Sequence, residues 1–205
     1  MVDIKQIEAT LHKHFLVTGP ITHIDPETGL IDVDGSVFLR RKMSKLPVQF
    51  GHVTGSFACD DSKLTTLLGA PHSVRGSFSC MGNLLTSLNH APEYVGRDFK
   101  CAHNKLTNLI GAPNEVGADF TCQLNPLTSL EGAPAVIPGW FWAPYTDTLP
   151  LLRTLVAQQH VELIVSPPEV QAILNDPEFK DKGKPGAIKC AVALIKAGYK
   201  ENARW

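Results

Sequence analysis

The chain repeats one eight-residue segment four times: LTTLLGAP at residues 64–71, LTSLNHAP at 85–92, LTNLIGAP at 106–113 and LTSLEGAP at 127–134. Successive copies start 21 residues apart. A fixed period of about 20 to 50 residues is typical of solenoids, in which each repeat is one unit stacked on the next. A coil this short cannot bury its apolar side chains alone, so its neighbours must cover them. The segment therefore predicts an array of stacked coils.

A Phe-x-Cys segment precedes each copy. Phenylalanine and cysteine alternate with small or polar residues, which predicts a short strand with Phe and Cys pointing inward. Stacking the coils pairs these strands into a parallel sheet. The residue three places after each cysteine is an asparagine in three coils and is expected to bond backbone groups freed by the bend. The positions are Phe57, Phe78, Phe99 and Phe120; Cys59, Cys80, Cys101 and Cys122; and Ser62, Asn83, Asn104 and Asn125.

A period between about 20 and 29 residues with paired leucines is typical of leucine-rich repeats. We therefore predict an α/β solenoid: a leucine-rich-repeat-like array of about five short coils with a parallel β-sheet, capped by an N-terminal helix plus hairpin and by C-terminal helices. Residues 2–15 have the spacing of an amphipathic helix, and the hairpin follows around the turn at 25–29. The predicted units are residues 1–34 for the N-terminal cap, 35–145 for the solenoid and 146–205 for the C-terminal helical region.

No copy of the repeat follows Phe141, so the array is expected to end there and three short helices to follow. The first begins at Thr148 and runs through Val156. The second has Ser166 as its cap and Pro167 at its first position. A loop at 183–186 leads to the third, over 187–197, which Gly198 ends. The apolar face of this third helix is expected to hold Ile188, Ala191, Val192 and Ile195.

Composition narrows the function classes. The 205 residues carry a formal charge of -1, which argues against a nucleic-acid partner, because nucleic-acid binders are usually basic. No apolar run of about 18 residues predicts a membrane span, and no signal peptide is recognisable, so we expect a cytoplasmic protein with reduced cysteines. The chain has no Cys-x-x-Cys, His-Glu-x-x-His or P-loop motif. We therefore predict no metal, no cofactor and no catalytic residues.

The coil pattern FxCxxNxLTSLxGAPxxV resembles the leucine-rich-repeat-like proteins of tailed bacteriophages and some bacteria. The segments GLIDVDGSVFLRRKMSKLPVQFGHVTGSF at 29–57 and LIKAGYKENARW at 194–205 resemble the flanks of the phage family. The Leu-Thr-Ser-Leu pieces are also similar to the repeats of bacterial effector proteins, but this chain has one more residue per coil and lacks their catalytic domain. The phage resemblance implies a protein that acts in a bacterial cytoplasm, and it supplies no catalytic residue.

The outward positions of the predicted sheet are the natural binding surface of a solenoid. They differ from coil to coil, whereas the inward positions stay constant. If Phe141 points inward, Trp140 and Trp142 both point outward, and tryptophan leads the residues of binding hot spots. A solvated face, or tryptophans covered by the C-terminal helices, is the alternative interpretation. The predicted partner-binding residues are Met81, Asp98, Lys100, Asp119, Thr121, Gln123, Trp140 and Trp142.

We therefore expect a non-enzymatic protein-binding module whose partner is a host protein or protein complex, such as a defence complex that it inhibits. Two alternatives stay open. One is an enzyme or nucleotide-binding protein with a site between the solenoid and the C-terminal helices, supported by the Gly/Lys loop at 183–186. The other is a structural or assembly protein of a virion. The sequence does not set the oligomeric state.

Overall fold

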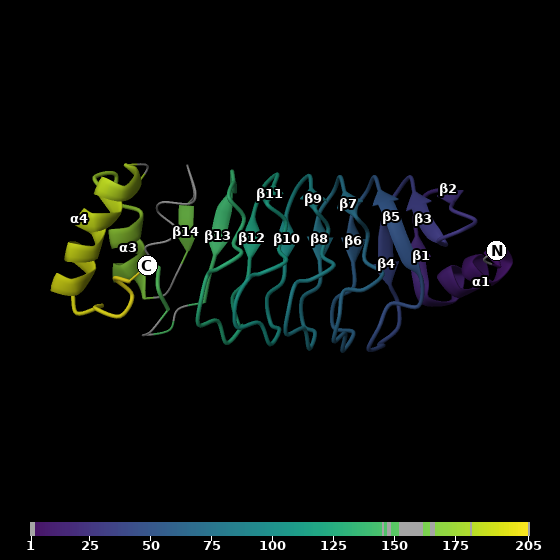
Figure 1. Cartoon of the computed structure of the whole chain (residues 1–205), viewed down its shortest axis with the longest axis horizontal. Coiled ribbons are helices and arrows are strands. Elements are labelled where there is room, and N and C mark those ends of the chain that lie inside the picture. Colours follow the sequence, from purple (N-terminus) through teal and green to yellow (C-terminus); the bar gives the residue numbers. More distant parts are fainter. Residues whose placement is uncertain are drawn as a thin grey trace.

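The computed structural model describes residues 3–144, 146, 149–151, 162–164, 167–180 and 182–204. Figure 1 shows a row of stacked coils with α1 at one end and α3 and α4 at the other. The chain is a β-solenoid of about five turns with parallel sheets, an N-terminal helix and a C-terminal helix. The predicted solenoid with its 21-residue spacing is confirmed.

One side of the coils forms a sheet that has eight strands in the described part of the chain. Its order is β1-β4-β6-β8-β10-β12-β13-β14, and every neighbouring pair is parallel except β1 and β4. The register places each inward phenylalanine beside that of the next coil. The strands are β1 (Phe15–Val17), β4 (Val37–Leu39), β6 (Phe57–Ala58), β8 (Phe78–Ser79), β10 (Phe99–Lys100), β12 (Phe120–Thr121), β13 (Trp140–Trp142) and β14 (Glu162–Ile164).

The opposite side of the coils forms a second sheet, which the sequence pattern did not predict. The valines that close each coil pair with one another in parallel, and the hairpin β2–β3 extends the sheet at its N-terminal end. The order is β11-β9-β7-β5-β3-β2. The strands are β2 (Ile21–Ile24), β3 (Leu30–Val33), β5 (Gln49–Val53), β7 (Ser73–Val74), β9 (Tyr94–Val95) and β11 (Glu115–Val116).

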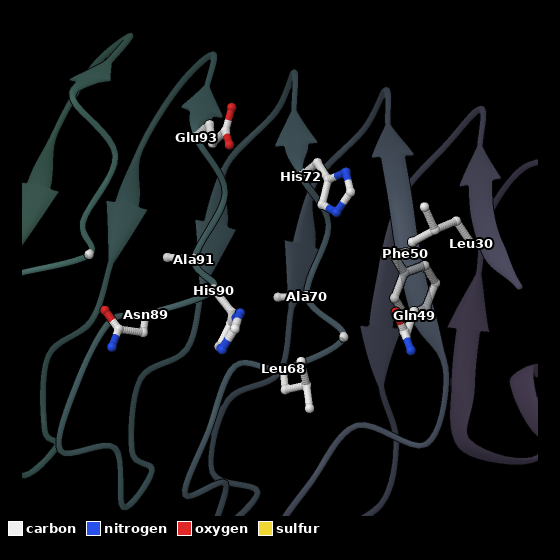
Figure 2. A pocket seen from close by; sticks show the side chains of 12 residues that line it. Leu30, Gln49, Phe50, Leu68, Ala70, His72, Asn89, His90, Ala91 and Glu93 are labelled. Atoms are coloured by element: carbon white, nitrogen blue, oxygen red, sulfur yellow. The ribbon is translucent and has the colours of Figure 1, made fainter. Parts of the chain in front are cut away.

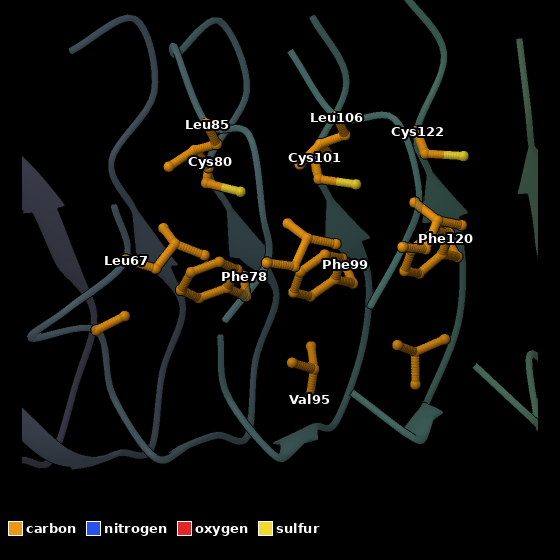
Figure 3. Packing of buried hydrophobic residues seen from close by; sticks show 14 of the residues in the cluster. Leu67, Phe78, Cys80, Leu85, Val95, Phe99, Cys101, Leu106, Phe120 and Cys122 are labelled. Carbon is orange, nitrogen blue, oxygen red and sulfur yellow. The ribbon is translucent and has the colours of Figure 1, made fainter. Parts of the chain in front are cut away.

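A stack of phenylalanine rings runs through the core between the sheets (Figure 3). The rings of Phe78 and Phe99, and those of Phe99 and Phe120, lie nearly parallel with centroids 5.3 Å apart. The leucines at the first and fourth positions of each repeated segment are also buried, whereas the extra leucine of the first copy, Leu68, is exposed. Phe78, Phe99 and Phe120 each contact a ring in both neighbouring coils. The burial that stabilises one coil therefore depends on its neighbours.

A ladder of buried asparagines holds the bend that follows each strand. Asn104 Nδ2 donates to the carbonyl oxygens of Cys80, Cys101 and Ala102 at 2.9, 3.1 and 3.3 Å. Its Oδ1 accepts the N–H of Leu85 at 3.1 Å. Asn83 and Asn125 make the equivalent bonds in the neighbouring coils. The expected role of this amide is confirmed, and each one joins two coils.

All five cysteines are buried and free. Burial in the apolar core raises the pKa of the four ladder thiols at Cys59, Cys80, Cys101 and Cys122. It also raises the pKa of the Cys190 thiol to about 12. A thiol that stays protonated is a poor nucleophile, so these side chains act as packing groups.

The native protein is therefore expected to resist the thiol reagent DTNB at pH 8. All five thiols should react once guanidinium unfolds the chain, because only the unfolded cysteines ionise near the ordinary pKa of 9.0. The native reaction rate should also stay low as the pH rises to 9, while the rate for free glutathione increases. Rapid titration of even one thiol in the native protein would contradict the buried ladder.

The N-terminal end differs from prediction in one respect. Helix α1 (Ile4–His14) starts at the cap Asp3, whose Oδ1 accepts the N–H of Gln6, and the hairpin β2–β3 is present as expected. Phe15, which the pattern placed in the helix, instead begins β1 and is buried against Phe50. Its position after four apolar residues at helical spacing gave no sign of this change.

The C-terminal end requires four corrections. Residues 149–151, which lie in the first predicted helix, are not helical; the rest of that helix and Ser166 lie outside the described residues. Helix α3 (Pro168–Leu174) has Pro167 as its cap, and residues 183–186, predicted as a loop, form the first turn of α4 (Gly183–Lys196). The predicted apolar face of α4 is largely exposed. The opposite face, containing Ala187, Cys190 and Leu194, is buried, while Ile188, Val192 and Ile195 are exposed.

Candidate functional site

The outer face of the eight-stranded sheet carries a pair of stacked tryptophans on β13. Phe141 is fully buried, whereas Trp140 is 45% exposed and Trp142 is partly buried. The two indole centroids lie 5.9 Å apart, with the ring planes inclined by 27°. The alternation along β13 is therefore as expected, with one ring inward and two outward. The C-terminal helices leave Trp140 open to solvent.

The residue that precedes each inward phenylalanine belongs to a hydrogen-bonded row, called here the corner row. In each coil a side-chain oxygen of this row accepts the backbone N–H of the same position in the next coil. Ser56 Oγ accepts from Ser77 at 3.1 Å, and Asp98 Oδ1 accepts from Asp119 at 3.4 Å. Asp119 Oδ1 accepts the N–H of Trp140 at 2.9 Å. The corner row therefore fixes the backbone that carries the tryptophans.

Serine and aspartate fill the same structural place in this row, so the hydrogen bonds do not require a carboxylate. Asp98 and Asp119 thus add negative charge beside the tryptophans. Lys100 Nζ lies 3.3 Å from Asp98 Oδ2 and offsets one of these charges. Within the described part of the chain, Asp119 has no cationic partner. The sequence alone shows that these positions are aspartates. It does not show that the hydrogen bonds of the corner row could be made without a charged group.

Two polar groups beside the tryptophans lack hydrogen bonds. Thr121 Oγ1 and Gln123 Oε1 are both covered and have no partner. Thr121 lies on β12 directly beside Trp142. Met81 follows β8, which β10 and β12 separate from β13, so it lies roughly 14 Å away at about 4.8 Å per strand. The structure therefore groups Asp119, Thr121 and Gln123 with the tryptophans, places Asp98 and Lys100 at the margin, and leaves Met81 outside.

Strand β14 was missed by the prediction that the array ends at Phe141. It pairs in parallel with β13, and its register places Glu162 beside Trp140 and Ile164 beside Trp142. Residues 162–164 carry no repeat motif, so the sequence offered no signal for this pairing. The tryptophans consequently lie on an inner strand of the sheet rather than at its edge.

A separate groove of about 410 Å³ lies over the corners of the first coils (Figure 2). Phe50 and Leu68 contribute apolar surface, and His72, His90 and Glu93 contribute polar groups. His90 has a φ of +69°, at the corner where the other coils have Gly69, Gly111 and Gly132. A left-handed conformation costs a non-glycine residue about 1 kcal/mol. All the polar groups of this groove are exposed and none is buried without a partner, so the groove indicates a ligand less strongly than the tryptophan pair.

No group of three or more His, Cys, Asp or Glu side chains among the described residues could hold a metal ion. Of the helices that the structure describes, none has the length and apolar character needed to cross a bilayer. The fold defines a repeat solenoid of the leucine-rich-repeat-like kind, with β-structure on both sides of its coils. Comparison of the chain with protein-family models, curated proteins and solved structures finds no match.

Proposed function

We propose that the chain is a non-enzymatic protein-binding module. Its binding site is the C-terminal part of the outer sheet face, called here the tryptophan site. The tryptophan site comprises Trp140, Trp142, Asp119, Thr121 and Gln123, with Asp98 and Lys100 at its margin.

The observation that carries this proposal is the stacked indole pair, in which Trp140 is exposed to solvent and Trp142 is partly buried. Tryptophan offers a large apolar surface and a polar N–H, and few rotamers are lost when a partner covers it. Contiguous exposed apolar surface on a soluble protein marks binding sites, and tryptophan is among the residues that dominate interface free energies. Indole rings in mutual contact keep part of that surface buried before binding, which holds them in one arrangement.

The support around the tryptophans favours a preformed site. The backbone of Trp140 is held by the hydrogen bond from its amide N–H to Asp119 Oδ1. The ring of the next residue, Phe141, packs against that of Phe120 in the core. Rigid supports of this kind reduce the entropy lost on binding.

The resemblance of the coils to phage repeat proteins favours a bacterial host protein as the partner, with the module acting in the host cytoplasm as an inhibitor or adaptor of a defence complex. The alternative of an enzyme or nucleotide-binding protein rested on the C-terminal region and its Gly/Lys segment, and residues 183–186 form the first turn of α4 rather than a loop. A role in virion assembly would require association between copies of this chain, which the experiment below also detects.

The expected result is that wild-type protein captures a stoichiometric partner from bacterial lysate and that a Trp140→Ala/Trp142→Ala variant does not. Removal of two hot-spot rings should cost at least about 3 kcal/mol, or roughly a hundredfold in affinity. The measurement is affinity capture followed by mass spectrometry, with circular dichroism to show that the variant is folded.

The matched control is Tyr94→Ala/Ile110→Ala, which removes two exposed apolar side chains away from this face. Equal capture by the wild type and both variants would assign the partner to another surface. Capture of copies of the chain itself would favour the assembly role. Retention of no protein would contradict the binding-module proposal.

A further inference from the structure

Acidic residues lie beside the tryptophan site in the corner row. In the register of the sheet, Asp119, which directly precedes β12, lies beside Trp140. Asp98 extends the same row by one coil. Lys100 is paired with Asp98 and offsets its charge, whereas Asp119 has no cationic partner within the described part of the chain. These three residues therefore leave a net negative charge beside Trp140.

The charge of Asp119 is not explained by the fold. Ser56 and Ser77 complete the same corner-row bonds in the earlier coils, so a hydroxyl suffices for the ladder. Asp98 has further partners, because its Oδ2 accepts the hydroxyl of Ser77 at 3.3 Å and pairs with Lys100. Asp119 makes only the corner-row bond to the backbone N–H of Trp140. A carboxylate that the ladder does not require, placed beside an exposed tryptophan, indicates a ligand that uses this charge.

We propose that the tryptophan site recognises a cationic side chain of its partner protein, an arginine or a lysine. This inference rests on the proposed function and names the chemistry of the bound group. The face of an indole attracts a cation through the ring quadrupole, and tryptophan is the strongest of the aromatic residues in this respect. A guanidinium can stack on one ring while it donates to a carboxylate at its edge, because its donors lie in one plane.

Asp119 is the residue that we expect to bind the cation. Its Oδ1 accepts the backbone N–H of Trp140. The other oxygen, Oδ2, is left for the incoming cation. A phosphate or another anion would be repelled by this row. A sugar ring would stack on the indoles without needing Asp98 or Asp119, so the two chemistries make different predictions for charge removal.

The test uses two peptides, Ac-Gly-Arg-Gly-Arg-Gly-amide and the same peptide with citrulline in place of arginine. Citrulline is nearly isosteric with arginine but neutral, and its ureido group has three N–H donors and one acceptor oxygen in place of the five donors of the guanidinium. The readout is the chemical shift of the indole N–H signals in nuclear magnetic resonance spectra, assigned with Trp140→Phe and Trp142→Phe. The arginine peptide should shift both signals, more weakly as salt increases, and the citrulline peptide should bind at least about fivefold more weakly.

Asp119→Asn supplies the matched variant, because an amide oxygen can still accept the N–H of Trp140 while the charge is lost. It should weaken the arginine peptide about fivefold and leave the melting temperature close to that of the wild type. Glu131→Gln removes one charge from a corner outside this face and should change neither. Cellohexaose serves as the sugar probe. The cation inference would be overturned if both peptides shift the indole signals equally, if neither peptide shifts them, or if only cellohexaose does. The lysate capture by the tryptophan double variant decides the binding-module proposal separately, so the two can fail independently.

Discussion

Replacement of Phe99 by alanine is expected to lower the free energy of unfolding by about 3 to 5 kcal/mol, the range for truncation of a buried aromatic ring. Phe99 is fully buried and stacks on Phe78 and Phe120 with centroid separations of 5.3 Å. Its loss removes both ring contacts and leaves a cavity in the middle of the array. In a chain of 205 residues the melting temperature should fall by roughly 10 °C.

Thermal and guanidinium denaturation followed by circular dichroism measure this effect. Lys100→Ala is the control, because Lys100 is the next residue and its side chain is 39% exposed on the outer face. The control should change the free energy of unfolding by less than about 1 kcal/mol. Equal melting curves for the wild type and Phe99→Ala would show that the inward assignment of the phenylalanines is wrong.

Replacement of Asn104 by alanine should destabilise the protein by about 3 kcal/mol, although it removes few atoms. The change leaves the N–H of Leu85 without a partner in the buried bend. It also removes one of the two amide bonds to each of the carbonyl oxygens of Cys80 and Cys101, which keep their bonds to Asn83 and Asn125. Each buried polar group left unsatisfied costs about 1 to 3 kcal/mol. Since the bonds join two coils, unfolding should lose cooperativity between the coils on either side of position 104.

Asn108→Ala provides the comparison for this second prediction. The side chain of Asn108 makes one local bond, from the N–H of Ile110 to Oδ1 at 3.1 Å in an exposed turn. Its removal should cost less than about 1 kcal/mol. If the two alanine variants have the same denaturation midpoint, the asparagine ladder does not stabilise the bends as described.

The solenoid and the inward residues of its main sheet could be predicted because the same residue types recur at a fixed spacing in several coils. Phe, Cys, Asn and Leu recur at one step, so each position is supported by its copies in other coils. The outward direction of Trp140 and Trp142 followed from Phe141 by simple alternation. These features depend on local periodicity, which a single sequence displays directly.

The features that the sequence did not predict depend on contacts between distant segments. The strands that carry the second sheet along the regular coils, β7, β9 and β11, have two residues each, such as Ser73–Val74, and are too short to show alternation. Helix α4 has apolar residues on two faces, and only packing against α3 decides that Leu194 is buried and Val192 exposed. The pairing of β14 with β13 is likewise visible only in the structure. The same holds for Asp119, whose charge is not needed for its hydrogen bond in the corner row.

The central claim is that a partner contacts the tryptophan site, and photo-crosslinking tests it most directly. A photoreactive p-benzoyl-phenylalanine would replace Trp140, Tyr94 or Val192, which are all exposed but lie on different surfaces: the outer sheet face, the second sheet and helix α4. After irradiation in bacterial cells, position 140 should give a discrete crosslinked band, and positions 94 and 192 should not. A crosslink from position 94 or 192, with none from position 140, would contradict the account.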